Sequence, residues 1–251
     1  MLNPKISVIT VTLNADRYLN HTIQSVKEQT YKNLEYIVID GGSTDSTLDI
    51  LKSNEGHIDH WVSSKDKGIA DAMNKGINLA SGDYVIFIQS DDYLHDKNSI
   101  KDAAKYLDKN NDILICKVAV LDEGNIKRLT NNMRLCFLTN FKMGSCHQGQ
   151  IISRNLLVRL GMYDTSFKIS MDYDFLLSAY RNGASSKSVD LVIAAMREGG
   201  ISSRRDWENL RKRFSEEKRI HFKHCKNYHM RFLYLIYWLI YPVYWRCRNI
   251  L

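Results

Sequence analysis

The stretch GDYVIFIQSDD (residues 82–92) joins a run of apolar, strand-favouring residues to two adjacent carboxylates. The run from Tyr84 to Ile88 predicts a strand that is covered on both faces, as in a parallel sheet. Polar groups at the carboxyl end of such a strand lie where open α/β sheets bind ligands. Asp91 and Asp92 repel each other unless a cation lies beside them, and a divalent metal carrying a phosphate-bearing substrate would serve. Alternatively, one of these acids caps a helix that begins near Lys97.

Strand and helix patterns alternate along the chain that leads to this stretch. Apolar, β-branched runs predict strands, and apolar residues three or four apart predict helices. The order strand–helix–strand predicts an α/β fold with a mostly parallel central sheet flanked by helices. The expected strands cover residues 5–12, 34–40, 58–63 and 84–88, and the expected helices cover residues 19–27, 48–51 and 69–80.

Polar side chains follow three of these strands. Asn14 follows the first strand, Asp40 ends the second, and Asp91 and Asp92 follow the fourth. The carboxyl ends of parallel strands share one sheet edge, so we expect these side chains to line a ligand site. Neither GxGxxG nor GxxxxGK[ST] occurs, which argues against a Rossmann dinucleotide site and a P-loop.

Composition narrows the class of protein. The chain has 251 residues, of which 44% are hydrophobic, and this suits a folded globular protein. Its five cysteines form no CxxC pair, which disfavours a zinc site or a disulfide framework and favours a reducing, cytosolic compartment. The N-terminus leads directly into the first expected strand, so we expect no signal peptide.

Positive charge is concentrated at the C-terminus. Residues 204–251 carry 12 Lys and Arg against 4 Asp and Glu, whereas the rest of the chain carries 23 against 24. This asymmetry predicts a partner specific to the C-terminal segment, either an anionic membrane surface or a nucleic acid. No nucleic-acid motif is present, which favours the membrane and argues against nucleic acid.

The C-terminal segment is also apolar and aromatic. Residues 206–231 show a basic helical pattern, and the run FLYLIYWLIYPVYW (residues 232–245) follows, interrupted by Pro242. This run is shorter than the roughly 20 residues that a transmembrane helix needs. Its tyrosines and tryptophans favour a membrane–water interface, so we expect an interfacial anchor. The alternative is a helix docked on the protein's own core or in a homodimer. The aromatic residues concerned are Tyr234, Tyr237, Trp238, Tyr241, Tyr244 and Trp245.

Six segments together resemble one family. They are SVITVTLN (7–14), EYIVIDGGSTDST (35–47), SKDKGIADAMNKGINLASGDYVIFIQSDD (64–92), CHQGQ (146–150), GMYDTSFKISMDYDFLL (161–177) and REGGIS (197–202). In this order they resemble a family 2 glycosyltransferase with a single A-type glycosyltransferase domain, in particular small bacterial enzymes of colanic-acid, O-antigen (lipopolysaccharide) and capsule assembly.

The resemblance implies a nucleotide-sugar site at the sheet edge. Asp40 would contact the base or ribose, and its alternative role is that of a turn residue or a helix cap. Asp71 is alternatively a helix-dipole contact. The chain departs from the family pattern at Gly41, where a second acid is common, and at Leu13, where an aromatic residue is common. The implied donor-binding residues are Thr12, Asn14, Asp40, Asp66, Asp71 and Asp91.

The resemblance also implies a metal ligand and a base. Asp92 would bind Mg²⁺ or Mn²⁺, and Asp172 would be the general base, with Asp174 as the alternative. His147, Gln148 and Asp174 would lie near the acceptor or the donor sugar. A glycine-containing loop at residues 199–202 would close over the donor, and Arg197, Arg204 and Arg205 could neutralise the diphosphate.

The implied activity is transfer of a sugar, with inversion, from a nucleotide donor to a glycan or a polyprenyl-diphosphate-linked acceptor. The enzyme would be a hexosyl- or acetylhexosaminyltransferase, peripheral on the cytoplasmic face of the membrane. Residues 1–95 would form the donor half and residues 96–205 the acceptor half, followed by a membrane-associating segment at residues 206–251.

Two other functions are weighed against this one. A sugar-nucleotide pyrophosphorylase would carry a glycine-rich, basic loop after the first strand, and the sequence LNADRYL (residues 13–19) does not resemble one. An inactive, membrane-bound assembly subunit would not need Asp91, Asp92 and Asp172 together.

Overall fold

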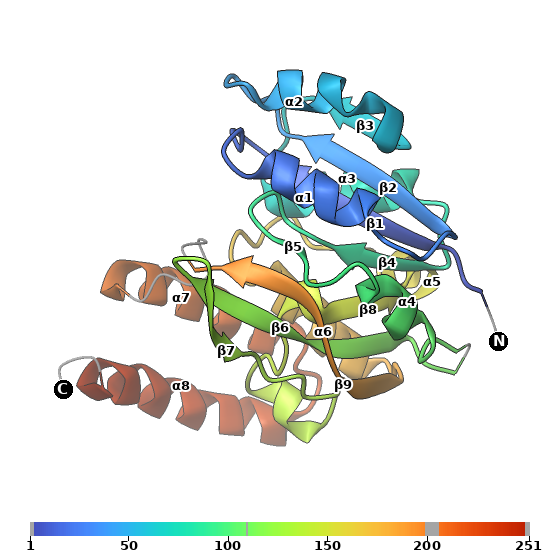
Figure 1. Cartoon of the computed structure of the whole chain (residues 1–251). Helices are drawn as coiled ribbons and strands as arrows, with labels where there is room; N and C mark the ends of the chain where they lie inside the picture. The colour runs from blue at the N-terminus through green and yellow to red at the C-terminus, as the bar shows by residue number, and fades with distance from the viewer. Residues whose placement is uncertain (1–2, 109, 199–205, 249–251) are drawn as a thin grey trace.

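A computed structural model describes residues 3–108, 110–198 and 206–248. Within these residues the chain forms a nine-stranded sheet in the order β3-β2-β1-β4-β8-β6-β9-β5, with β7 paired to β6. Helices cover the sheet on both sides, and the two C-terminal helices lie at the lower left in Figure 1, with α8 along the bottom.

The first half of the sheet is parallel. β1 (Ile6–Thr12) pairs with β2 (Leu34–Asp40) on one side and β4 (Tyr84–Phe87) on the other, and β2 pairs with β3 (His60–Ser63). These strands confirm the strands expected from the sequence. The intervening helices are α1 (Leu19–Lys27), α2 (Thr47–Ser53) and α3 (Ile69–Leu79), with a short 3-10 turn η1 (Glu55–His57) before β3.

Alternation of side chains along the parallel strands builds two cores. Val8 of β1 packs with α1, while its neighbour Ile9 faces α3, because successive strand residues point to opposite faces. Helix α3 approaches β1 closely at Gly76, where an added Cβ would lie 2.5 Å from Ile9. This close contact holds α3, whose first turn carries Asp71, against the sheet.

The second half makes the sheet mixed. β8 (Gln150–Ser153) is antiparallel to both β4 and β6 (Ile113–Asp122), whereas β6 is parallel to β9 (Ser186–Arg197). The predicted mostly parallel order therefore describes the first half, and antiparallel pairs are added beyond β4. The remaining elements are β5 (Tyr93–Leu94), β7 (Asn125–Leu129), α4 (Ser99–Ala104), α5 (Arg154–Arg159), α6 (Met171–Arg181), η2 (Phe137–Asn140) and η3 (His147–Gly149).

The C-terminal segment folds as two helices that pack on the sheet domain. α7 (Trp207–Lys223) is capped by Asp206, whose carboxylate accepts from the backbone N of Asn209, and α8 (Tyr228–Arg248) folds back on it. His221 of α7 is fully buried. Its Nε2 lies 2.7 Å from the Tyr173 hydroxyl of α6, and its Nδ1 lies 3.0 Å from Trp238 Nε1 of α8. The two helices are therefore joined to α6 through a buried polar network.

Most of the expected interfacial aromatic residues of α8 face the protein, which corrects their expected orientation. Tyr234 and Trp238 are buried against Leu210 and Phe214 of α7, and Tyr237 and Tyr241 pack against the same cluster. Of the expected interfacial aromatics, Tyr244 is the most exposed. In residues 3–108, 110–198 and 206–248, no helix has both the length and the apolar character needed to cross a membrane.

Candidate active site

Asp91 and Asp92 lie in the short link between β4 and β5. The Thr22 hydroxyl of α1 donates to the carbonyls of Ser90 (2.9 Å) and Asp92 (2.6 Å), which fixes the backbone of the link. Helix α4 begins at Ser99, and its N-cap is Asn98. Neither acid caps that helix, so the helix-cap alternative is wrong.

The Asp92 carboxylate is held from two sides. It is 2% exposed, and it accepts hydrogen bonds from Gln148 Nε2 (2.7 Å) and from the backbone N of Arg197 (3.2 Å). Burial, together with the charge of Asp91, raises the pKa of Asp92 to about 7. A cation bound beside two adjacent carboxylates would lower the repulsion between them.

Arg197 supports the link from β9. Its guanidinium donates to the Asp91 carbonyl and lies 4.3 Å from the Tyr18 ring centroid and 3.2 Å from His21 Nδ1. Through these contacts the Arg197 side chain is bound to the protein itself, beside Asp91 and after the end of β4. The expected loop at residues 199–202, and Arg204 and Arg205, lie outside the described residues.

η3 connects the metal-ligand candidate to the base candidate. Gln148 bonds Asp92, and the preceding residue, His147, places its Nδ1 3.7 Å from Asp172 Oδ2. On its other side, His147 Nε2 lies 3.2 Å from Gln89 Nε2 at the end of β4. The structure therefore brings together Asp92, Gln148, His147 and Asp172, which are far apart in the sequence.

Asp172 and Asp174 point in different directions from the first turn of α6. Asp174 is buried and bound to Lys223 Nζ (2.9 Å) and His224 Nε2 (2.8 Å) at the end of α7. Residues two apart on a helix lie on nearly opposite faces, so only Asp172 can face His147. The placement of Asp174 near the acceptor, and its role as alternative base, are corrected by this geometry.

Two acids of α7 that the sequence did not single out lie near Asp172, and Glu216 supports the segment that carries it. Glu216 accepts three backbone N–H groups at the start of α6, from Lys168 (2.8 Å), Ile169 (2.9 Å) and Ser170 (2.9 Å). Glu217 pairs with Arg213 (3.3 Å), and burial, together with the charge of Asp172, raises the pKa of Glu217 to about 7 although Arg213 opposes the rise. A signal was present, because Glu216 and Glu217 are the only acids in residues 209–251.

Asp40 holds the turn after β2. Its carboxylate is fully buried and accepts from Ser63 Oγ (2.6 Å), Ser43 Oγ (2.5 Å) and the backbone N of Gly42 and Ser43 (both 3.0 Å). These bonds give Asp40 the turn role that was its alternative. In the adjacent strand, the buried Thr12 hydroxyl has no hydrogen-bond partner among the residues that the structure describes. An unpaired buried hydroxyl at this edge is a candidate ligand contact.

Asn14 and two acids border the same edge. Asn14 has a φ of 51°, and its Oδ1 accepts from Thr44 N (2.9 Å), which ties the first two strand-end loops together. Asp66 accepts from Gly68 N (2.8 Å), and Asp71 accepts from Lys67 N (3.1 Å). These bonds use one oxygen of each carboxylate.

The departure from the family pattern at Gly41 has a steric cause. A Cβ added at Gly41 would collide with the Asp66 carboxylate and would lie 3.5 Å from Leu13 Cδ1. A second acid after Asp40 would therefore displace Asp66. The Leu13 side chain is exposed beside this position and presents an apolar surface at the edge.

The donor set fits a metal that is shared with a phosphate ligand. No cluster of three or more His, Cys, Asp or Glu side chains suited to a metal occurs in the described part of the chain. Mg²⁺ is commonly held by one or two carboxylates while substrate phosphates and water complete its shell. Asp92 and Asp91 can supply those carboxylates.

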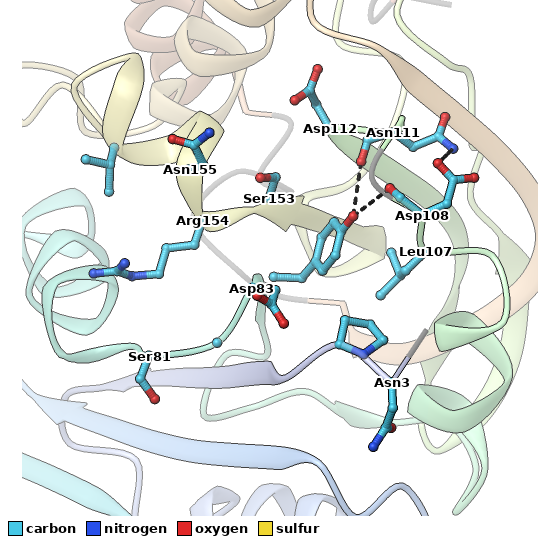
Figure 2. Close-up of a pocket in the computed structure, with 14 residues that line it drawn as sticks. Asn3, Ser81, Asp83, Leu107, Asp108, Asn111, Asp112, Ser153, Arg154 and Asn155 are labelled. Atoms are coloured by element: carbon cyan, nitrogen blue, oxygen red, sulfur yellow. Dashed lines mark hydrogen bonds between the residues drawn. The ribbon is translucent and has the colours of Figure 1, made fainter. Parts of the chain in front are cut away.

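A cavity of about 650 Å³ lies at the opposite edge of the sheet (Figure 2). It is bordered by residues at the start of β4 and the end of β8, including Asp83, Tyr84 and Arg154, and the Tyr84 hydroxyl donates to the Asp108 carbonyl (2.7 Å). Asp92 and Asp172 do not line it, so it is separate from the candidate active site.

Comparison with known proteins identifies the family. The model for "Glycosyl transferase family 2" matches residues 7–165, which is more than half of the chain. The chain belongs to glycosyl transferase family 2. A Mycobacterium bovis "PGL/p-HBAD biosynthesis glycosyltransferase" is 30% identical over 213 residues, covering 81% of each chain. An uncharacterized glycosyltransferase of Mycobacterium tuberculosis is 34% identical over 185 residues, covering 70% of this chain and 69% of the relative.

Solved structures of similar fold carry donor nucleotides. S. aureus TarS (residues 1–349) in complex with UDP-GlcNAc superposes with a TM-score of 0.70 at 21% identity, covering 90% of this chain and 69% of TarS. The mannosyltransferase PcManGT of Pyrobaculum calidifontis, in complex with GDP-Man and Mn²⁺, gives a TM-score of 0.63 at 18% identity. The match covers 87% of this chain and 65% of the mannosyltransferase chain. These likenesses confirm the A-type fold of this family 2 glycosyltransferase.

Proposed function

We propose that this glycosyltransferase transfers a hexosyl or acetylhexosaminyl group, with inversion, from a nucleotide-sugar donor to a glycan or lipid-linked saccharide acceptor in surface polysaccharide synthesis. The observation that carries this proposal is the link through η3. Gln148 bonds Asp92 while the adjacent His147 faces Asp172, so a metal-ligand candidate and a base candidate border one site.

The donor would lie along the carboxyl edge of the parallel strands. Asp92, assisted by Asp91, would hold Mg²⁺ or Mn²⁺ there. The bound metal would stabilise negative charge on the leaving nucleoside diphosphate. Thr12, with its unpaired hydroxyl, is the strongest candidate for a direct donor contact, and Asn14, Asp66 and Asp71 stay predicted contacts.

Asp172 would act as the general base. The acceptor hydroxyl attacks the anomeric carbon from the side opposite the diphosphate, and its proton passes to the Asp172 carboxylate as the bond to the diphosphate oxygen breaks. Attack from the opposite side inverts the anomeric centre. His147, 3.7 Å from Asp172 Oδ2, would orient the carboxylate toward the acceptor.

The two halves of the sheet would divide this work. Residues 1–95 would bind the donor, and residues 96–198 would contribute His147 and Asp172 on the acceptor side. Nucleotide sugars and polyprenyl-linked acceptors meet at the cytoplasmic face of the membrane, so we place the enzyme there as a peripheral protein.

The test is metal-dependent donor binding by the purified full chain. Thermal unfolding is followed with UDP, GDP and their sugars, with and without Mn²⁺, because a ligand at 100 times its Kd adds about 2.7 kcal/mol of stability. Asp92→Asn should abolish the Mn²⁺-dependent stabilisation. The control Asp190→Asn, at a side chain that is 85% exposed on β9, should retain it.

Two outcomes would contradict the proposal. If no nucleotide stabilises the wild type in the presence of Mn²⁺, the donor site is wrong. The second outcome is that the donor binds, but no acceptor extract supports sugar release or transfer, and the wild type and Asp172→Asn show the same lack of activity. The protein is then better described as an inactive assembly subunit.

A further inference from the structure

Helix α8 has an apolar face that the described residues of the chain leave exposed. The outward side chains follow one another at helical spacing, while the inward Tyr234 and Trp238 are buried. Leu239 is 74% exposed, and the neighbouring Ile240 is 62% exposed. Contiguous apolar surface of this kind marks an interaction site. The outward residues are Phe232, Leu235, Ile236, Leu239, Ile240 and Val243.

The short turn η2 extends this surface. Phe137 and Leu138 are exposed, and the Phe137 ring lies 5.8 Å from Phe141. Phe141 in turn contacts Tyr234 of α8 (ring centroids 5.8 Å apart), and its carbonyl accepts from the Tyr237 hydroxyl (3.1 Å). η2 and α8 therefore lie side by side at the bottom of the molecule in Figure 1. We call the outward residues of α8 together with Phe137 and Leu138 the apolar face.

Both parts of the apolar face come from segments without acids. Residues 124–163, which include η2, contain six Lys and Arg and no Asp or Glu. Residues 218–251, which include α8, contain seven Lys and Arg and no Asp or Glu. Arg134 and Lys142 are exposed on either side of η2, and Arg231 and Arg246 are exposed near the two ends of α8.

We propose that the apolar face is the surface by which this protein lies on an anionic lipid bilayer, with α8 parallel to the membrane plane. Aliphatic side chains would enter the boundary between headgroups and acyl chains, and the bordering cations would meet anionic headgroups. The inference deepens the proposed peripheral location, and it names side chains opposite to Tyr234 and Trp238, which the sequence suggested.

A second copy of the chain fits this surface less well than a bilayer does. A homodimer through α8 would bring Arg231 and Arg246 of each protomer to an interface that has no acid in residues 218–251 to pair with them. Like charges at an interface are unfavourable, whereas an anionic bilayer satisfies both the apolar and the basic character.

The experiment is flotation of the full chain with vesicles. One set is phosphatidylcholine alone, and the other contains phosphatidylcholine and phosphatidylglycerol in equal parts. The wild type should float with the anionic vesicles and less so at high salt. The double variant Leu239→Glu/Ile240→Glu should reduce vesicle binding by about tenfold or more, because it places two anions on the apolar face. The matched control is Val158→Glu on α5, at another exposed aliphatic residue, and it should float like the wild type.

Three results would overturn the inference. The wild type could fail to float, the double variant could float unchanged, or the double variant could only convert a dimer to a monomer in light scattering while vesicle binding persists. Circular dichroism and Mn²⁺-dependent nucleotide binding are measured on each variant. A double variant that binds nucleotide but not vesicles supports the surface, whereas failure of nucleotide binding in every variant and in the wild type concerns the proposed activity alone.

Discussion

Asp92 and Asp172 face neighbouring residues of η3, yet their surroundings differ. Asp92 is fixed by the sheet and the elements next to it, through Thr22 of α1, Gln148 of η3 and the backbone of Arg197 in β9. Asp172 is carried by the first turn of α6, and that turn is held by Glu216 of α7. The metal-ligand candidate therefore depends on the central sheet and the elements next to it, while the base candidate depends on the C-terminal helices.

This dependence changes what the C-terminal segment is expected to do. His221 connects Tyr173, next to the base candidate, with Trp238 of α8. Removal of residues 229–251 would strip Tyr234 and Trp238 from the buried cluster around α7. A truncated chain would therefore lose support for α6 as well as the apolar face, so point variants are the better probes.

Substitution of Asp172 should have the strongest effect on activity, and it should distinguish the role of Asp172 from that of Asp92. Asp172→Asn removes the proton acceptor and should lower kcat by about 10²- to 10⁴-fold. Mn²⁺-dependent donor binding should persist in this variant, because we propose that Asp172 serves the acceptor side, whereas Asp92→Asn should lose both donor binding and activity. Steady-state kinetics and nucleotide titration on the two variants check this. Loss of donor binding in Asp172→Asn would show that both acids serve the donor.

Substitution of Asp174, which lies two residues from Asp172 on α6, should affect stability and not catalysis. Asp174→Asn leaves Lys223 and His224 without their carboxylate and should lower the free energy of unfolding by about 3 kcal/mol. We expect a value at the lower end of the range for buried pairs because Lys223 is 41% exposed. Urea denaturation gives the stability, and kcat at low temperature should stay near the wild-type value. A stable but inactive Asp174→Asn enzyme would return Asp174 to the catalytic group.

A pH effect should arise from His221. Burial, with the nearby charge of Arg181, lowers the pKa of His221 to about 3. The folded protein therefore keeps His221 neutral while the unfolded chain binds a proton below about pH 6.5, so this contribution to stability is complete above pH 6.5 and is lost as pH falls toward 3. Between about pH 7 and about pH 5 the loss is about 2 kcal/mol.

The measurement for His221 is a difference between two proteins. Asp92 and Glu217 have raised pKa values and act in the opposite direction as the pH falls, but they are present in both the wild type and His221→Gln. Urea denaturation at the two pH values should show that the wild type loses about 2 kcal/mol more than His221→Gln. Equal losses would mean that His221 is charged in the folded protein.

Much of the first half of this molecule could be predicted from sequence, and less of the second. Strands β1, β2 and β4 are short, apolar and bounded by turn residues, so local pattern alone defines them and the edge that they share. The pairing of β8 with β4, and the contact of His147 with Asp172, depend on segments far apart in the chain that no local pattern joins. The orientation of α8 was predicted wrongly because both of its faces are apolar, and only packing against Phe214 and His221 shows which face turns inward.

The smallest effect tests whether α7 positions the base. Glu216→Gln replaces a carboxylate that accepts three backbone N–H groups with an amide whose own N–H₂ cannot accept, so the start of α6 should loosen. The resulting displacement of the Asp172 carboxylate should lower kcat by about tenfold, while the KM for the donor stays unchanged. The matched control is Glu208→Gln on the same helix, whose side chain is 79% exposed and pairs with Lys212 (2.7 Å), and it should leave kcat unchanged. If Glu216→Gln instead raises the donor KM with kcat intact, α7 supports the donor site, and the separation between a sheet-held ligand and a helix-held base is wrong.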